Sequence, residues 1–203
     1  MRPLFWSDWS DRFLWNVEDA FYLGDALLVC PIVQQGERSR TISLPQGYWY
    51  NFWNDSMMEG GKMIELDSPL EQIPLLVKAG GILPIEEGQQ LILHLYSLVK
   101  GAGEKNPPFQ NPKSKIQNFY TLYTDAGDGY GESRLDRFKI TQHGKILELV
   151  WEQQGNYGFP YQSVQLNVHG MSLQQVWVDA REATVQGQQL QCYFFKQIRF
   201  HYD

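Results

Sequence analysis

An acid-rich turn in the second half of the chain has the side chains that a hard cation needs. Asp125, Asp128 and Glu132 supply carboxylate oxygens, and glycines lie between them. Oxygen ligands of this kind could surround a calcium ion. The segment lacks the ligand count and the spacing of an EF-hand loop, however. We therefore favour a β-turn with solvated acids and no metal, with a calcium site at these three residues as the alternative.

A second pair of acids lies in the first eleven residues, which read MRPLFWSDWSD. Asp8 and Asp11 follow large aromatic side chains there, and this stretch has no polar lead-in. Such a beginning is expected when the first residues of a sequence lie in the middle of a folded domain. The simplest interpretation of the two acids is that one or both are solvated in a loop or cap a helix.

Aromatic side chains near residue 160 form a third group with chemical potential. Tyr157, Phe159 and Tyr161 alternate, so in a strand they would share one face, and amide side chains lie close by. Coplanar rings beside hydrogen-bonding groups are what a sugar-binding surface requires. Two glycines and a proline interrupt the same stretch, which favours a loop folded back over the core. Glycan binding at these rings stays an alternative.

Cysteine and histidine do not indicate a metal site. Cys30 and Cys192 lie far apart in the chain, and four scattered histidines lack the spacing of a zinc site. Two buried, reduced thiols are expected instead. We expect neither a metal nor another cofactor.

The composition indicates a globular chain that binds neither nucleic acid nor membrane. Of the 203 residues, 43% are hydrophobic and 14% aromatic, which is enough for a packed core. The net charge of −6 argues against nucleic acid, whose binders usually present a basic face. No apolar run approaches the roughly 20 residues of a membrane helix. The start does not resemble a signal peptide, so a cytoplasmic location is expected.

A nearly continuous apolar run marks the strand around which the elements are organised. Ala26–Val33 has the length of a strand that is buried on both faces. Just before it, Asn16 can cap a helix, acids follow in the first turn, and Gly24 can close the last turn. These signals predict a short helix over Asn16–Leu23.

Alternating patterns and turn residues predict many more strands. They are expected at Leu4–Trp6, Arg38–Leu44, Tyr48–Trp53, Lys62–Leu66, Ile73–Val77, Gly81–Ile85, Leu91–Leu98, Phe119–Thr124, Arg137–Gln142, Ile146–Glu152, Ser163–His169, Gln175–Val178, Leu190–Phe195 and Gln197–Tyr202.

Short strands separated by turns about every ten residues are typical of sandwiches. We therefore expect a mainly β chain with two antiparallel β-sandwich domains in tandem. The proximal sandwich would comprise residues 24–87 and the distal sandwich residues 88–203. The segment 100–118 is rich in lysine, proline and asparagine and is predicted to be a mobile loop within the distal domain.

Five motifs in order resemble glycoside hydrolase family 31, the α-glucosidase and α-xylosidase group. They are RPLF (Arg2–Phe5), FYLGDALLVCPIV (Phe21–Val33), LPQGYWYNFWN (Leu44–Asn54), EGG (Glu59–Gly61) and IPLLVKAGGILP (Ile73–Pro84). A further stretch, LYTDAGDGYGE (Leu122–Glu132), resembles the distal domain that follows in many bacterial members, although this match is less specific. The resemblance thus extends over nearly the whole chain.

The resemblance implies a retaining α-glycosidase, in which a (β/α)8 barrel carries two catalytic aspartates and two β-sandwich domains follow. Neither motif that carries those aspartates occurs in this sequence, so no catalytic residue is assigned. Residues 1–23 would be a remnant of the last barrel strand and helix. Barrel active sites lie at the carboxyl ends of the strands. Phe5, Trp6 and Asp8 are therefore expected at the rim of the sugar pocket of the intact enzyme.

The leading hypothesis is a non-catalytic C-terminal part of an α-glycosidase that hydrolyses terminal α-linked glucosyl or related residues. Its expected partners are the catalytic barrel of the same polypeptide and, through the parent enzyme, a carbohydrate. One alternative is a glycan-binding module that uses exposed aromatic rings of the distal sandwich. Another is a pair of sandwiches that mediates homo-oligomer contacts. Rings exposed on one flat face would favour the glycan-binding module, and buried rings would favour the oligomer.

Overall fold

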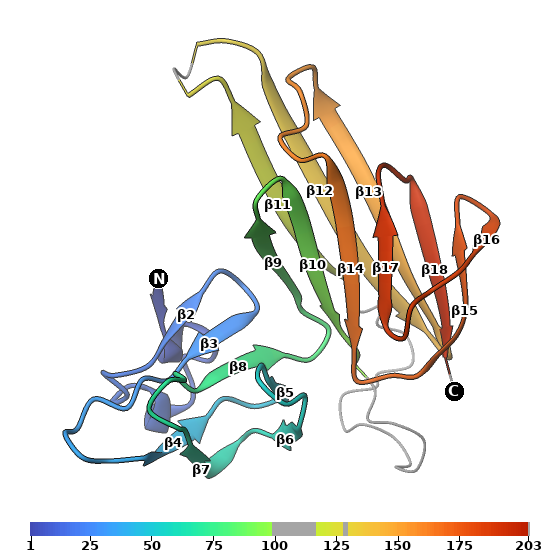
Figure 1. Cartoon of the computed structure of the whole chain (residues 1–203). Coiled ribbons are helices and arrows are strands. Elements are labelled where there is room, and N and C mark those ends of the chain that lie inside the picture. The colour runs from blue at the N-terminus through green and yellow to red at the C-terminus, as the bar shows by residue number, and fades with distance from the viewer. Residues whose placement is uncertain (99–116, 128–129, 203) are drawn as a thin grey trace. The chain divides into compact units, whose positions relative to one another are not determined.

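Two compact units make up the chain, Met1–Gly81 and Ile82–Asp203. The computed structural model describes residues 1–98, 117–127 and 130–202 (Figure 1). Strands dominate the described residues, and the helical segments are two single 3-10 turns, η1 (Leu4–Trp6) and η2 (Arg12–Leu14). None of the helices in this described part is long and apolar enough to cross a membrane.

The first unit contains a six-stranded sheet and a two-stranded sheet. The larger sheet has the order β1 (Arg2–Pro3), β2 (Phe21–Leu23), β3 (Leu27–Val29), β8 (Leu75–Lys78), β5 (Tyr48–Asn51) and β6 (Met57–Glu59). The smaller sheet pairs β4 (Ser39–Leu44) with β7 (Lys62–Asp67). Every pair in both sheets is antiparallel.

The core of the first unit lies between its two sheets. Side chains from both sheets and from the turns η1 and η2 contribute to it: Leu4, Leu14, Tyr22, Leu28, Ile42, Leu44, Trp49, Leu66 and Leu76. Trp49 is buried with its indole Nε1 donating to the Pro45 carbonyl oxygen at 2.9 Å. A Cβ atom on Gly60 would lie only 1.9 Å from that same oxygen. Glycine at this position is therefore what lets the turn approach the tryptophan.

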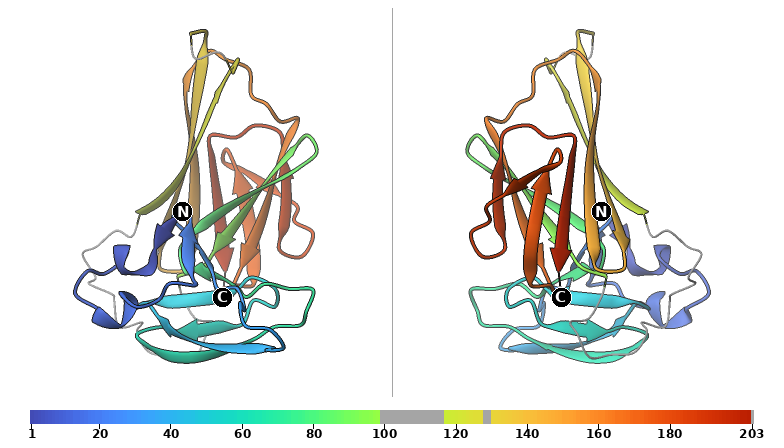
Figure 2. Two further views of the ribbon diagram at one scale, coloured as in Figure 1. Left: turned by 90° about the vertical axis from the view of Figure 1, so that its left-hand side faces the viewer. Right: turned by 90° about the vertical axis from the view of Figure 1, so that its right-hand side faces the viewer.

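The second unit is a sandwich of a four-stranded and a six-stranded sheet (Figure 2). The first has the order β17 (Gln189–Cys192), β14 (Ser163–His169), β10 (Gln90–Tyr96) and β9 (Ile82–Glu87). The second has the order β11 (Gln117–Asp125), β12 (Ser133–His143), β13 (Ile146–Gly155), β18 (Gln197–Tyr202), β15 (Leu173–Val178) and β16 (Arg181–Ala183). Alternate apolar residues of both sheets form one buried core, as the strand period of two requires. The mainly β sandwich architecture expected from the sequence is confirmed.

One pair departs from the antiparallel rule. β10 and β14 run parallel over seven residue pairs, from Gln90 opposite Ser163 to Tyr96 opposite His169. Both strands lie in the middle of the four-stranded sheet, and their side chains that face the core are apolar. A parallel pair cannot be joined by a hairpin, and here the connection passes through β11, β12 and β13 of the facing sheet.

The helix predicted over Asn16–Leu23 is wrong. Phe21–Leu23 forms β2 instead, which pairs with β1 on one side and with β3 on the other. Backbone pairing on both edges outweighs the weak helix signals of an eight-residue segment. Leu4–Trp6, predicted as a strand, is the 3-10 turn η1.

The sheets also locate the boundary between the units. β9 pairs with β10, so the sheet system of the second unit begins at Ile82, within the range that the sequence analysis gave to the proximal domain. Residues 1–23 contribute β1 and β2 to the sheet of the first unit. The loop predicted at 100–118 lies outside the described residues, apart from positions 117 and 118, which begin β11.

Candidate functional site

Four aromatic rings gather at the beginning of the first unit, and we call Phe5, Trp6, Trp9 and Trp15 the aromatic cluster. Phe5 lies 5.1 Å from Trp9 and 5.7 Å from Trp15, measured between ring centroids. Trp9 is also 5.6 Å from Trp6 and 6.1 Å from Trp15. The three indoles are 52–56% exposed. Rings this large usually bury most of their area.

Two buried leucines and two short turns hold the aromatic cluster in place. Leu4 in η1 and Leu14 in η2 are fully buried in the core of the first unit. The Asp11 carboxylate caps η2 by accepting from the Phe13 N–H at 3.0 Å. The indole Nε1 of Trp15 donates to the Trp9 carbonyl oxygen at 3.3 Å. The exposed rings are therefore positioned by an ordered backbone.

Asp8 lies between the indoles of Trp6 and Trp9 in the sequence. Its carboxylate accepts from the Ser10 hydroxyl at 2.6 Å and from the Ser10 N–H at 2.9 Å. These hydrogen bonds lower the pKa of Asp8 below its usual value of 3.8. The group is therefore ionised at neutral pH. It can accept hydrogen bonds from hydroxyl groups, but it is a poor proton donor.

Two ion pairs hold the segment between β1 and β2, which carries the aromatic cluster. Arg2 donates to Asp25 Oδ1 at 2.5 Å and to the Gly24 carbonyl oxygen at 2.6 Å. Arg40 on β4 reaches Asp19 from the two-stranded sheet. The segment that carries the aromatic cluster is thus fastened at both of its sheet connections.

The rings near residue 160 do not form a flat surface. The planes of Phe159 and Tyr161 are inclined by 72°, and both rings pack against the core of the second unit. Phe159 also contacts Trp151 at 4.9 Å. The Tyr161 hydroxyl donates to Glu86, and burial followed by this hydrogen bond raises its pKa. Tyr157 is partly buried, and its N–H lies 3.4 Å from the Ser133 carbonyl oxygen.

The acidic turn is held by a local hydrogen bond. Asp125 Oδ1 accepts from the Gly127 N–H at 2.8 Å, which is an Asx-turn. Glu132 is exposed, and Asp128 lies outside the described residues. Across the described positions, no group of three or more ligating side chains could hold a metal ion. Both cysteines are buried and free, and burial raises the pKa of Cys30 to about 12.

A buried ion pair in the second unit was not found from the sequence. Arg134 donates to Asp136 through Nε at 2.7 Å and through Nη2 at 2.9 Å. The Trp151 indole donates to the same carboxylate at 2.7 Å, and the Phe159 ring covers the guanidinium at 4.9 Å. The signal was available, because positions 134 and 136 alternate in phase with the inward-facing Phe138. This network is part of the core.

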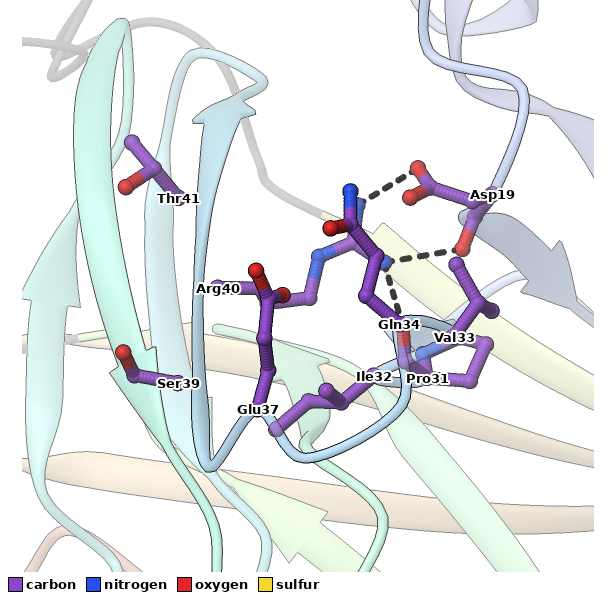
Figure 3. A pocket seen from close by; sticks show the side chains of 9 residues that line it. All are labelled: Asp19, Pro31, Ile32, Val33, Gln34, Glu37, Ser39, Arg40 and Thr41. Atoms are coloured by element: carbon purple, nitrogen blue, oxygen red, sulfur yellow. Dashed lines mark hydrogen bonds and ion pairs between the residues drawn. The ribbon is translucent and has the colours of Figure 1, made fainter.

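A polar hollow in the first unit was also missed. Its volume is about 360 Å³, and nine residues line it (Figure 3): Asp19, Pro31, Ile32, Val33, Gln34, Glu37, Ser39, Arg40 and Thr41. Arg40 Nη1 donates to the carbonyl oxygens of Asp19 at 2.9 Å and Pro31 at 2.6 Å. Its Nη2 donates to Asp19 Oδ1 at 2.5 Å. Eight of these residues lie within residues 31–41 and Asp19 comes from a separate segment, so the hollow depends on a contact that no local motif marks.

Comparison with protein families shows which family the first unit resembles. Residues 1–83 match the family model described as "Glycosyl hydrolase family 31 C-terminal domain". Residues 1–83 thus resemble the C-terminal domain of glycosyl hydrolase family 31. The five ordered motifs of the sequence lie in this range, apart from Pro84 at the end of the last one, and the resemblance that they indicated is confirmed.

Curated relatives of this family 31 domain include glycosidases. An α-glucosidase of Saccharolobus solfataricus is 35% identical over 94 residues, which are 46% of this chain and 13% of the relative. An α-xylosidase of the same organism is 31% identical over 86 residues, which are 42% of this chain and 12% of the relative. The chain therefore spans only about an eighth of the length of these two relatives.

Solved structures share the fold of both units. A family 31 dextranase of Flavobacterium johnsoniae superimposes with a TM-score of 0.79 at 18% identity, covering 99% of this chain and 29% of that one. A family 31 α-xylosidase of Xanthomonas citri gives a TM-score of 0.66 at 22% identity, covering 98% and 21%. The β-rich architecture that follows the family 31 domain in this chain is thus found in larger family 31 enzymes.

Proposed function

We propose that this chain is a non-catalytic C-terminal part of a retaining α-glycosidase and supports the catalytic barrel of the same polypeptide. The observation that carries the proposal is the match of residues 1–83 to the family 31 C-terminal domain. Relatives named as an α-glucosidase and an α-xylosidase are about eight times longer than the part that the chain covers. The substrate class proposed for the parent enzyme is accordingly a terminal α-linked glucosyl or related residue.

The chemistry of the described acids supports a non-catalytic role. Retaining hydrolysis needs two carboxyl groups about 5 Å apart, one of which acts as a proton donor. Asp8 is held ionised by Ser10, and Asp11 is engaged in capping η2. Local backbone and hydroxyl donors therefore occupy both acids beside the exposed rings. In our proposal Phe5, Trp6 and Asp8 contribute only contacts at the rim of a sugar pocket.

The aromatic cluster supports a docking role. Three indoles that are each about half exposed form an apolar surface that is normally covered in a finished protein. Their supporting backbone is fastened by the two ion pairs of Arg2 and Arg40. A preformed surface loses little conformational entropy when a partner covers it. The partner in our proposal is the barrel of the same polypeptide.

A hydrolysis assay tests the non-catalytic role. The purified chain should release no nitrophenol from nitrophenyl α-glucoside or nitrophenyl α-xyloside, while a full-length family 31 α-glucosidase assayed in parallel does. Without two positioned carboxyl groups most of the rate enhancement is missing. Turnover that copurifies with the chain and disappears in Asp8→Asn would overturn the proposal. Turnover that is unchanged in that variant and varies between preparations would identify a contaminant and leave the chain inactive.

A further inference from the structure

The polar hollow beside Arg40 has the size of a small-molecule site. Its volume of about 360 Å³ lies at the lower end of the range for ligand pockets, which begins near 300 Å³. Asp19, the loop after β3 and the start of β4 enclose it (Figure 3). A ligand with a single six-membered ring is therefore the largest that would be well enclosed.

Arg40 provides a rigid donor in the wall of the hollow. Its side chain is only 10% exposed, and its guanidinium is fixed by two backbone carbonyls and the Asp19 carboxylate. A guanidinium has five N–H groups, and three of them are used in these bonds. Within the described part of the chain, Nε has no acceptor, and one N–H of Nη2 is left for a ligand oxygen. A donor held this way needs no reorganisation on binding.

The charges of the hollow select against anions. The Arg40 cation is already neutralised by Asp19 at 2.5 Å, and Glu37 adds a second carboxylate to the lining. The formal charge of the lining is therefore −1. A phosphate or carboxylate ligand would meet net repulsion, whereas a neutral ligand would not.

The remaining side chains match hydroxyl groups. Glu37 and Asp19 offer acceptors, and the Gln34 amide offers both a donor and an acceptor. A hydroxyl group donates and accepts at once, so it can bridge such neighbours. Apolar atoms contribute little to the lining, so a ligand here would be held by polar contacts. A lining of mixed donors and acceptors fits a neutral polyol.

We propose that this hollow binds a neutral, ring-sized polyol, either a free monosaccharide or the terminal residue of a glycan. The site lies on the family 31 C-terminal domain itself and needs no catalytic group. It is independent of the proposed supporting role, because a chain that hydrolyses nothing can still bind a sugar here. Few direct contacts and an open mouth give an affinity on the order of millimolar.

Amide NMR of the full chain tests the proposal. Titration with D-glucose should shift the amide signals of Asp19 and residues 32–41 in a saturable way, and inorganic phosphate should not. Maltotriose distinguishes the two sources: binding clearly weaker than that of glucose assigns the free monosaccharide, and binding at least as tight assigns the terminal residue of a glycan. The absence of saturable shifts in these segments with any of the sugars, or saturation by phosphate instead, would overturn the proposal.

Exposed residues of the lining allow variants that fold. Glu37→Ala should weaken glucose binding about tenfold, because it removes a charged acceptor. Gln34→Ala should weaken it less, because it removes a neutral group. Glu71→Ala is the matched control: it is also exposed, lies outside the lining and should bind as the unchanged chain does. Unaltered binding in both lining variants would overturn the site, and unchanged thermal unfolding would show that each variant is intact.

Discussion

At the scale of single residues, the second unit contains a buried ion pair between Arg134 and Asp136. Asp136 is completely buried, yet its two oxygens receive three hydrogen bonds from Arg134 and Trp151. Taking a carboxylate and a guanidinium out of water is costly, and the pair is tolerated because each partner is satisfied by the other. Removing one partner leaves the other as an isolated buried charge.

We therefore expect Asp136→Asn to lower the free energy of unfolding by about 3–5 kcal/mol, because it leaves the Arg134 cation without its counterion. Urea titration followed by tryptophan fluorescence measures this loss. Glu152→Gln on the exposed side of β13 is the matched control and should stay within about 0.5 kcal/mol. A loss below about 1 kcal/mol for Asp136→Asn would show that the pair is hydrated in solution.

Single residues also show how far the sequence could lead. The spacing of Tyr157, Phe159 and Tyr161 indicated rings close together, and the interrupting glycines indicated a loop. Both ideas have support in the packing of Phe159 and Tyr161 against the core. No sequence pattern could reveal that Arg40 reaches Asp19, because this contact depends on where two distant segments meet. The hollow that results was therefore invisible from the sequence.

At the level of elements, the alternation of hydrophobic residues predicted strands well, whereas the capping signals predicted a helix that does not form. Ser163–His169 and Gln197–Tyr202 were predicted with the bounds that the structure has. The apolar run Ala26–Val33 contains β3, but only Leu27–Val29 pairs with neighbours. The helix signals before it failed, since pairing of Phe21–Leu23 with two strands is a tertiary effect. Short strands such as β6 and β16 carry too few residues to show a period.

β3 is central enough to test by one substitution. Leu28 is fully buried and lies opposite Tyr22 and Leu76, so Leu28→Ala should destabilise the first unit by about 2–5 kcal/mol through lost burial and a cavity. Chemical denaturation of the full chain measures the change. Leu23→Ala on the neighbouring strand removes the same atoms from a side chain that is 52% exposed, and should cost far less. Equal losses for both variants would contradict the assigned burial.

At the scale of the whole molecule, each unit has a hydrophobic core of its own. The second unit buries one continuous core between two sheets. The first unit buries its own core but also presents the aromatic cluster on its outside. The sequence motifs identified the first unit because each motif is a continuous stretch of residues. They did not predict that β9 belongs to the second unit, because this depends on the pairing of β9 with β10.

Without a covering partner, the aromatic cluster should make the chain self-associate. We expect sedimentation velocity to show a weight-average mass that rises with concentration, because exposed aromatic surface drives association. The double variant Trp6→Ser and Trp9→Ser should shift this rise to higher concentration. Trp53→Ser, which changes a 45% exposed indole outside the cluster, should leave it unchanged. A monomer at every concentration, in the unchanged chain, would show that the cluster is too small to drive association.

The parallel pairing of β10 with β14 has a consequence for how the chain is synthesised. Gln90 and the Ser163 beside it are 73 positions apart. At about 5–20 residues per second, β10 leaves the ribosome roughly 4–15 seconds before its neighbour exists. During this interval one edge of β10 has no strand to bond with, and Leu91, Leu93 and Leu95 face a sheet that is incomplete, because β15, β16 and β18 are made only after β14. Pairings this distant in sequence also form slowly. The second unit should therefore become protease-resistant well after the first. A chaperone that covers β10 would not speed up folding, but it would prevent aggregation until β14 has been synthesised.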